Sequence, residues 1–239
     1  MRIGVAIALD SFAPSGFVDP TSLPNLLLWL RGDKGVTLNA ANVSAWADQS
    51  GTGDANKNAA QSTAINQPGY TASDAAYSNQ STLSFSGSQW LDGVGLWAVA
   101  ASQPTTIYVV GEQISSDSAY FTGGAAGSRQ ALVQDTGDVW SMYAGNAFVD
   151  GTTHTTSPSC ACAIFNGASS AIYSGASFAA AQGSGNAGAS SLTQTSVGAL
   201  VGGVAKMVGK IAEIVIYSGT HSAGSRAQLR SYFLSRYGI

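Results

Sequence analysis

Short apolar stretches, separated by turn-forming residues, run through most of the chain. They are rich in β-branched and aromatic residues, and Gly, Asn, Asp and Ser separate nearly all of them. They occupy residues 82–85, 105–110, 131–133, 139–143, 161–165, 171–173 and 211–217. The sequence between them shows no long helical pattern. Many short strands at this spacing favour an antiparallel sandwich over a parallel sheet with crossover helices. The pattern therefore predicts an all-β fold.

Residues 222–237 have a helical pattern instead. Apolar side chains recur there at helical spacing, at Leu229, Tyr232, Phe233 and Tyr237. Ser222 or Ser225 is suited to cap the start, and Gly238 stands where a helix-terminating residue is expected. We therefore expect a short C-terminal α-helix that packs on the sheets. Residues 176–195 are rich in Ala, Gly and Ser, which fits either a strand pair or a surface loop.

The N-terminal region reads as a short strand and then a loop with several prolines, before the apolar run at residues 26–30. We expect residues 1–23 to form an arm or an edge strand and residues 24–239 to form one domain, a length that one sandwich can fill. If the arm anchors the domain to a partner, its contact residues are Arg2, Ile3, Val5, Ile7, Leu9, Phe12 and Phe17.

Composition and charge exclude several classes of partner. Charged residues make up 10% of the chain and the net charge is −3, with no basic stripe, so nucleic acid is not expected. Apolar runs stay far below the roughly 20 residues that a membrane span needs, so no membrane insertion is expected. Cys160 and Cys162 are too close in sequence for an unstrained disulfide and too few for a zinc site, which predicts buried thiols.

Three stretches carry a resemblance to a known group. They are LWL at 28–30 with GVTL at 35–38 and VSAWADQSG at 43–51, IFNGASSAIY at 164–173, and GKIAEIVIY at 209–217. In this order they resemble the concanavalin A-like, laminin G-like domains of bacteria and tailed phages. The resemblance covers residues 24–239. It implies a two-sheet antiparallel jelly-roll sandwich, with ligands held on the concave sheet or on the loops at its rim, and does not fix function.

Glycoside hydrolysis requires two carboxyl groups that flank one bond. Glucanases of the same group carry two glutamates on one strand, whereas Glu112 and Glu213 are the only glutamates here and lie far apart in the sequence. We expect Glu213 to make a structural hydrogen bond or ion pair, and Glu112 to be a solvated rim charge. His154 and His221 are expected in exposed turns. The sequence thus predicts no enzyme.

The resemblance also raises the question of calcium, because related modules often hold one ion on a loop of carboxylates and carbonyls. Two loops cluster such oxygen atoms, one with Asp48 and Asp54 and one with Asp135 and Asp138. Ordinary Asx-type turns would place the same residues there. The expectation is therefore no obligatory cofactor, with calcium as the alternative. A hydrolase remains an alternative only if two carboxyl groups outside the family pattern, such as those of Asp135 and Asp138, act as the catalytic pair.

Sugars are recognised by aromatic faces together with amide, carboxylate and backbone groups. The candidates are Trp97, Trp140, Tyr143, Asn146 and Asp150. Trp29 and Trp46 are expected in the core, and Trp90 is expected to have a packing role.

These observations favour a non-catalytic surface protein with a lectin-like, glycan-binding sandwich. We expect it on a virion surface, as a capsid decoration or fibre protein of a tailed phage that contacts a virion protein lattice. The alternative is an extracellular carbohydrate-binding or adhesion module. The sequence leaves the oligomeric state open, a homo-oligomer included.

Overall fold

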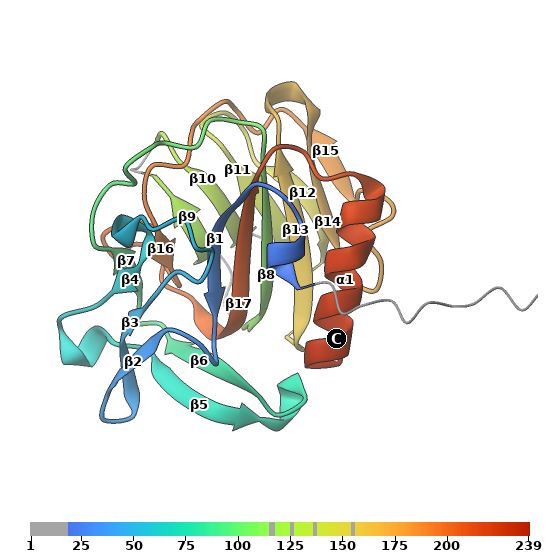
Figure 1. Ribbon diagram of the computed structural model, residues 1–239. Coiled ribbons are helices and arrows are strands. Elements are labelled where there is room, and N and C mark those ends of the chain that lie inside the picture. Colours follow the sequence, from blue (N-terminus) through green and yellow to red (C-terminus); the bar gives the residue numbers. More distant parts are fainter. Residues whose placement is uncertain (1–18, 115–117, 125–126, 136–137, 154–155) are drawn as a thin grey trace, which may run out of the picture.

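The computed structural model describes residues 19–239 except 115–117, 125–126, 136–137 and 154–155. The seven anchor candidates in the N-terminal arm, Arg2 to Phe17, lie outside the described residues. Within them, the chain is an all-β molecule with one α-helix at its C-terminal end (Figure 1). The predicted fold class is confirmed at this level, and each of the seven apolar stretches lies within an observed strand.

The strands follow one another in short steps, as the sequence pattern predicts. They are β1 (Leu26–Arg31), β2 (Val36–Asn39), β3 (Asn42–Trp46), β4 (Ala59–Ala60), β5 (Gly69–Asp74), β6 (Gln80–Ser86), β7 (Leu91–Gly93), β8 (Thr105–Gln113), β9 (Ser118–Gly123), β10 (Gln130–Asp135), β11 (Val139–Tyr143), β12 (Val149–Thr153), β13 (Ser159–Phe165), β14 (Ser170–Ser174), β15 (Gly183–Gly185), β16 (Ser196–Val197) and β17 (Val208–Ser218). The helical elements are α1 (Ala223–Tyr237) and the 3-10 turns η1 (Pro20–Ser22), η2 (Ala55–Lys57), η3 (Ala64–Asn66), η4 (Ala75–Tyr77) and η5 (Gly167–Ser169).

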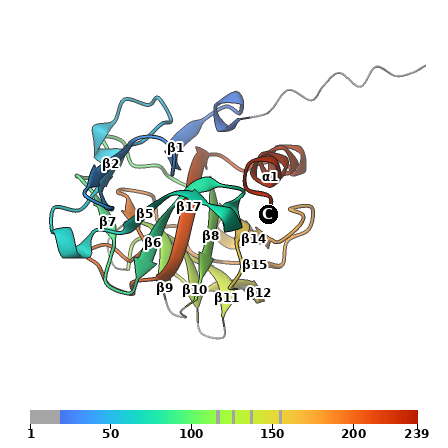
Figure 2. The same ribbon diagram turned by 90° about the horizontal axis from the view of Figure 1, so that it is seen from below.

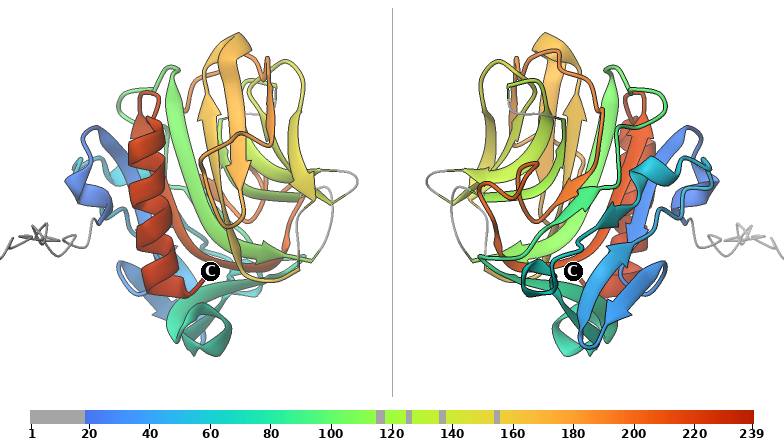
Figure 3. Two further views of the ribbon diagram at one scale, coloured as in Figure 1. Left: turned by 90° about the vertical axis from the view of Figure 1, so that its right-hand side faces the viewer. Right: turned by 90° about the vertical axis from the view of Figure 1, so that its left-hand side faces the viewer.

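Antiparallel pairing joins the strands of the described residues into one sheet. From β12 the pairing runs through β11, β10, β9, β16, β7, β4, β3, β5, β6, β17, β8, β13 and β14 to β15, while β2 joins β3 and β1 joins β17. The two ends of this path, β12 and β15, lie next to each other. A Cβ atom at Gly183 would collide with the backbone oxygen of Asp150, so glycine permits this close approach. The sheet is nearly closed (Figures 2 and 3).

Alternation along the central strands divides the apolar side chains between two cores. In β8, Ile107 and Val109 point into the space that the curved sheet encloses, whereas Tyr108 and Val110 point to its outer side. Because successive side chains of a strand face opposite ways, β13 and β17 divide their residues in the same manner. The inner core contains Trp46 and Trp140, and Trp29 belongs to the outer core, so Trp29 and Trp46 are buried as predicted.

Helix α1 covers the outer core formed by β17, β8 and β13 (Figure 3). Its start and end match the sequence signals. The Ser222 hydroxyl accepts a hydrogen bond from the Ser225 backbone N–H at 3.1 Å, and Gly238 has a left-handed φ of 71° at the C-cap. Leu229 and Phe233 are fully buried beneath the helix. The helix is therefore an integral part of the packing, as expected.

Residues 19–23 pack on the body of the molecule. Pro20 is buried, its carbonyl oxygen accepts a hydrogen bond of 2.7 Å from the hydroxyl of Tyr217, and Leu23 contacts the outer core. The small-residue stretch at 176–195 contributes one short strand, β15, and is otherwise irregular; Ala187 and Leu192 within it reach the inner core. This stretch is thus a packed connection with one strand.

Candidate functional site

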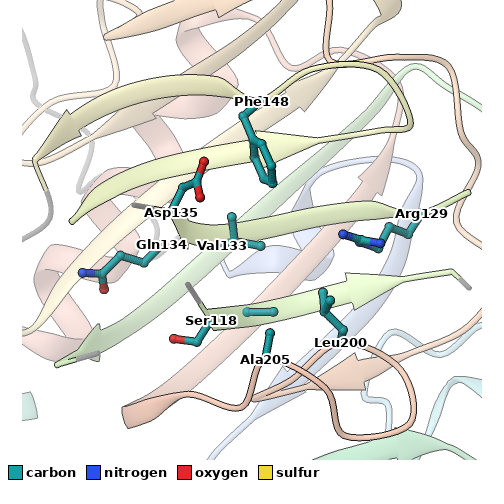
Figure 4. Close-up of a pocket in the computed structure, with 9 residues that line it drawn as sticks. Ser118, Arg129, Val133, Gln134, Asp135, Phe148, Leu200 and Ala205 are labelled. Atoms are coloured by element: carbon teal, nitrogen blue, oxygen red, sulfur yellow. The ribbon is translucent and has the colours of Figure 1, made fainter. Parts of the chain in front are cut away.

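A cleft of about 160 Å³ opens on the outer side of β9 and β10. Leu132 points into the inner core, so its neighbours on β10, Ala131 and Val133, face the opposite way. Together with Ala119 of β9 and Leu200 they form a separate apolar floor. The residues that line the cleft are Ser118, Ala119, Arg129, Val133, Gln134, Asp135, Phe148, Leu200 and Ala205 (Figure 4). We call this site the Phe148 cleft.

Phe148 is the exposed aromatic side chain of the cleft. It lies just before β12, and 42% of its surface is accessible. Figure 4 shows its ring directed over the floor towards Val133. The ring of Tyr143 lies 5.2 Å away from that of Phe148, tilted by 39°. Such a pair offers an apolar surface of the kind on which the C–H face of a sugar packs.

Arg129 stands at one end of the cleft, immediately before β10. Its side chain points into the cleft in Figure 4, and its guanidinium carbon lies 5.0 Å from the centre of the Tyr143 ring. This stacking orients the guanidinium group. Its Nε atom is buried and has no hydrogen-bond partner among the residues that the structure describes. This end of the cleft therefore carries a buried donor that no described residue satisfies.

Gln134 and Asp135 stand at the opposite end (Figure 4). The Gln134 amide nitrogen donates to Asp138 Oδ1 at 2.8 Å, while its Oε1 atom is buried without a hydrogen-bond partner within the described ranges. Arg129 and Asp135 are six residues apart on an extended segment, which separates their Cα atoms by roughly 20 Å. The cleft thus has a cationic end and an anionic end, with an apolar floor between them.

The segment that carries Leu200 and Ala205 forms one wall and is fixed by Trp90. A Cβ atom at Gly203, where φ is +72°, would collide with the Trp90 ring. Lys206 lies over the same ring at 4.9 Å. The Trp90 indole N–H donates to Asp92 at 3.0 Å. Trp90 therefore supports the wall by packing, in line with the packing interpretation.

Three of the predicted sugar-binding residues lie on or near this face. Tyr143 borders the cleft through its contacts with Phe148 and Arg129. Asp150 is exposed on β12 and accepts a 2.6 Å hydrogen bond from Ser141 on β11. Asn146 is exposed in the turn between these strands and donates to a backbone oxygen at residue 186. The residues that line the cleft were not predicted to bind sugar; Asp135 was predicted as a calcium candidate.

Trp97 and Trp140 were predicted to bind sugar, and their burial contradicts a stacking role. Trp140 is 2% exposed and stacks on Tyr120 with ring centres 4.8 Å apart, because alternation along β11 turns it inward. Trp97 is 5% exposed and donates from its indole to Thr195 at 3.0 Å. A sugar ring has no access to either indole face in this structure.

The loop from Asp48 to Asp54, one of the two calcium candidates, surrounds a buried ammonium group. Lys57 is only 6% exposed, and its Nζ atom donates to the Leu27 carbonyl at 2.8 Å and to the Thr52 hydroxyl at 3.2 Å. Burial lowers the pKa of Lys57, while the charges of Asp48 and Asp54 act to raise it. The loop therefore contains a cation of its own.

The carboxylates of that loop accept hydrogen bonds from backbone N–H groups. Asp48 accepts from the backbone N–H groups of Trp29 at 2.8 Å and Ser50 at 2.9 Å, and Asp54 accepts from those of Asn56 at 3.1 Å and residue 98 at 2.8 Å. The contacts with Ser50 and Asn56, each two residues further along the chain, are the Asx-type arrangement that was weighed against calcium.

The second calcium candidate lies at the hairpin after β10. Asp138 has a φ of 57° and accepts from Gln134, and Asp135 lines the cleft. In the part of the chain that the structure describes, no group of three or more His, Cys, Asp or Glu side chains is placed to hold a metal ion.

The two glutamates lie outside the cleft. Glu213 is fully buried beneath α1 and accepts hydrogen bonds from Trp29, from Tyr232 at 3.1 Å and from Tyr237 at 2.6 Å, so the predicted structural hydrogen bonding is confirmed. Burial raises its pKa to about 7 against the opposing effect of these donors. Glu112 was expected to be a solvated rim charge, which is wrong: it is 9% exposed and pairs with Lys210 at 3.5 Å.

His221 was expected in an exposed turn, and the structure contradicts this. It is 8% exposed, and its Nδ1 atom lies 2.8 Å from the Tyr108 hydroxyl. Burial and the charge of Arg226 lower its pKa to about 4. His154 lies outside the described residues. Cys160 and Cys162 are free, buried thiols, as predicted, and burial raises the pKa of Cys160 to about 12.

A larger groove of about 570 Å³ runs beside the Asp54 loop. Short side chains at positions 98–102 form much of its lining, together with Leu27, Thr52, Asp54, Lys57 and Ser218. The neighbouring Trp97 ring is turned into the core. The lining of this groove includes no aromatic side chain among the described residues. Despite its smaller volume, the Phe148 cleft is therefore the better candidate for sugar recognition.

Comparisons with known proteins find a similar fold in solved structures. No family model matches the chain, and no curated protein matches it by sequence. Domain 4 of an extracellular GH43 arabinanase from Geobacillus stearothermophilus, solved with arabinotriose, is similar in structure. Its TM-score is 0.60 at 15% identity, and the match covers 86% of this chain and 98% of that one.

Two further solved structures are longer chains. An arabinofuranosidase complexed with arabinofuranosyl-α-1,2-xylobiose matches with a TM-score of 0.63 at 14% identity, over 82% of this chain and 51% of that one. The Trypanosoma rangeli sialidase in complex with sialic acid matches with a TM-score of 0.53 at 14% identity, over 90% of this chain and 33% of that one. This chain spans about half and a third of these enzymes. At such identities the likeness concerns the fold alone.

Proposed function

We propose that this chain is a non-catalytic carbohydrate-binding module and that the Phe148 cleft is its binding site. The observation that carries the proposal is the exposed Phe148 ring above an apolar floor, between Arg129 and Gln134, each of which has a polar atom without a hydrogen-bond partner among the described residues. Sugars present this combination of an apolar ring face and peripheral hydroxyl groups. Structural neighbours solved with arabinotriose and with other sugars support the same class of ligand.

The arrangement of carboxyl groups supports binding without hydrolysis. Glycosidases place two carboxyl groups about 5 to 10 Å apart across the scissile bond. Asp135 is the one carboxylate among the described residues that line the cleft. Asp138, its partner in the hydrolase alternative, accepts a hydrogen bond from Gln134, and Glu213 is sealed beneath α1. We therefore propose that the module holds its glycan and leaves it intact.

We propose two settings for this activity. The first is the surface of a tailed-phage virion, where residues 1–23 would bind the protein lattice and the nearly closed sheet would be a jelly roll of the concanavalin A-like, laminin G-like group. The second is a free extracellular adhesion module. Mass spectrometry of purified virions distinguishes them: many copies of the chain per particle support the first setting, and absence from the particle supports the second.

A glycan array tests the proposed function directly. The wild-type chain is expected to bind a defined subset of glycans, and Phe148→Ala is expected to lose about tenfold or more in affinity because the stacking surface is removed. Ile65→Ala is a matched control, since Ile65 is 80% exposed and outside the cleft. We propose that no metal takes part, so EDTA should leave binding unchanged. Equal binding by wild type and Phe148→Ala would overturn the assignment of the site.

A further inference from the structure

Arg129 differs from every other arginine that the structure describes. Each of the other four donates at least one hydrogen bond: Arg31 to Asp33 at 2.5 Å, Arg226 to the His221 carbonyl at 2.9 Å, Arg230 to the Gly175 carbonyl at 2.9 Å, and Arg236 to the Tyr237 hydroxyl at 3.2 Å. Arg129 makes no hydrogen bond or ion pair with any described residue, although its Nε atom is buried.

A buried, unpaired donor on a charged group costs free energy, and proteins rarely leave one without a partner. The guanidinium group is also restrained, because it stacks on the Tyr143 ring at 5.0 Å. A guanidinium group whose orientation is already restrained loses little conformational entropy when it binds a planar anion through two parallel hydrogen bonds. The geometry of Arg129 is therefore that of a receptor for a carboxylate.

The residues around Arg129 indicate which kind of ligand bears that carboxylate. The floor beside Arg129 is apolar, formed by Val133 and Leu200, with the Phe148 ring above it. The carboxylate that lines the cleft, Asp135, stands at the opposite end, with its Cα atom roughly 20 Å along the strand from that of Arg129. A ligand anion bound to the guanidinium group would therefore lie at the end of the cleft opposite this carboxylate.

We infer that the Phe148 cleft selects acidic sugars, with Arg129 binding the carboxylate of a uronic acid residue while the sugar ring packs against Phe148. This inference rests on the proposed function and names the substrate class of the same site. Arg129 is a specificity-determining residue in this account, whereas Phe148 supplies affinity for neutral and acidic rings alike.

The test compares trigalacturonic acid with its methyl ester, by calorimetry at fixed ionic strength. The ester keeps the sugar rings and removes the negative charges. Wild type is expected to bind the acid about tenfold more tightly than the ester, because charge-assisted bidentate hydrogen bonds are lost with the ester. Arg129→Gln should remove this preference while its affinity for the ester stays within about twofold. Arg129→Lys should keep part of the preference, since the charge remains and the fork is lost.

Lys206→Gln is the matched control. It removes the same charge from the wall beside the cleft, but the Lys206 side chain is engaged on Trp90 and does not line the cleft. This variant should keep the wild-type preference. A disaccharide that bears sulfate in place of carboxylate completes the set, and it should bind more weakly than the carboxylate ligand. Thermal melting verifies that every variant is folded.

Four results would overturn the inference. Wild type that binds acid and ester equally, with both lost in Phe148→Ala, would refute the preference and leave the proposed function standing. If Arg129→Gln and Lys206→Gln lose the preference for the acid over the ester to the same extent, the preference comes from the net charge of the protein and not from Arg129. Equal binding of the sulfated ligand would refute carboxylate recognition. Absence of binding to neutral and acidic glycans alike would refute the proposed function itself, and this inference with it.

Discussion

Lys57 shows how one side chain can replace a bound ion. Its ammonium group lies within a loop that was a calcium candidate, and it holds the Leu27 carbonyl and the Thr52 hydroxyl together. Its ring contact with Trp97, at 5.1 Å, links the loop to the core. A lysine at 6% exposure is tolerated because these partners replace its hydration.

Removal of this internal cation should be costly. Lys57→Ala is expected to lower the free energy of unfolding by about 2 kcal/mol, because two charge-assisted hydrogen bonds are lost and their acceptors remain partly buried. Urea denaturation measures the change. Lys34→Ala is the control: Lys34 is exposed in a turn, and its substitution should change stability by less than about 0.5 kcal/mol. Equal effects of the two substitutions would contradict the account.

At the scale of elements, Glu213 connects helix α1 to the sheet. It lies on β17 and accepts hydrogen bonds from Tyr232 and Tyr237 of the helix and from Trp29 of β1. Burial is the largest influence on its carboxyl group and raises the pKa from 4.5 to about 7. The helix is therefore docked on a carboxyl group that binds a proton more readily in the folded state than in the unfolded state.

This pKa shift predicts a pH dependence of stability. Between pH 4.5 and 7 the native state holds a proton that the unfolded state has released, so stability falls as pH rises through this window and levels off above it. From pH 5 to pH 8 the loss attributable to Glu213 is roughly 2 to 3 kcal/mol. The Glu213→Gln variant should lose less free energy of unfolding between pH 5 and pH 8 than wild type, by this same amount. Urea denaturation at both pH values measures the difference. Parallel pH profiles for wild type and variant would contradict the assignment.

The strands and the helix were predictable because local pattern and packing agree. In β8, β13 and β17 alternation separates two cores, and in α1 Ser222 and Gly238 give cap signals. The path of the sheet was not predictable, because closure depends on contacts between strands far apart in sequence, such as β12 and β15.

The site was only partly predictable, for a related reason. Aromatic residues near turns were chosen, yet the period of two places Trp140 inside and Tyr143 outside on the same strand. Counting that period from buried Val149 would have pointed to Phe148 as outward-facing. Arg129 gave no local signal, because its lack of a partner is a property of the folded chain.

At the scale of the whole molecule, the body begins before residue 24. The buried Pro20, its hydrogen bond with Tyr217 and the contact of Leu23 with the outer core join residues 19–23 to the body. The predicted arm, residues 1–23, thus includes five residues that pack on the body, and residues 1–18 are its remaining part. The two parts can be separated by truncation.

A chain without residues 1–18 should melt at the same temperature as the full chain. A chain without residues 1–23 should lose about 1 to 3 kcal/mol of stability, because a buried proline and a buried hydrogen bond are removed. Differential scanning calorimetry compares the two truncations with the full chain. A large loss on removal of residues 1–18 alone would assign that segment to the fold and would contradict an arm.

The central claim is that the Phe148 cleft holds the glycan. An NMR titration of the isotope-labelled full chain with an oligosaccharide selected on the glycan array tests it most directly. We predict that the largest amide shift changes cluster at residues 129–135, 143–149 and 200–205, and that Phe148→Ala abolishes them. Shift changes centred instead on the groove at residues 98–102, with the Phe148 cleft unaffected, would contradict the claim.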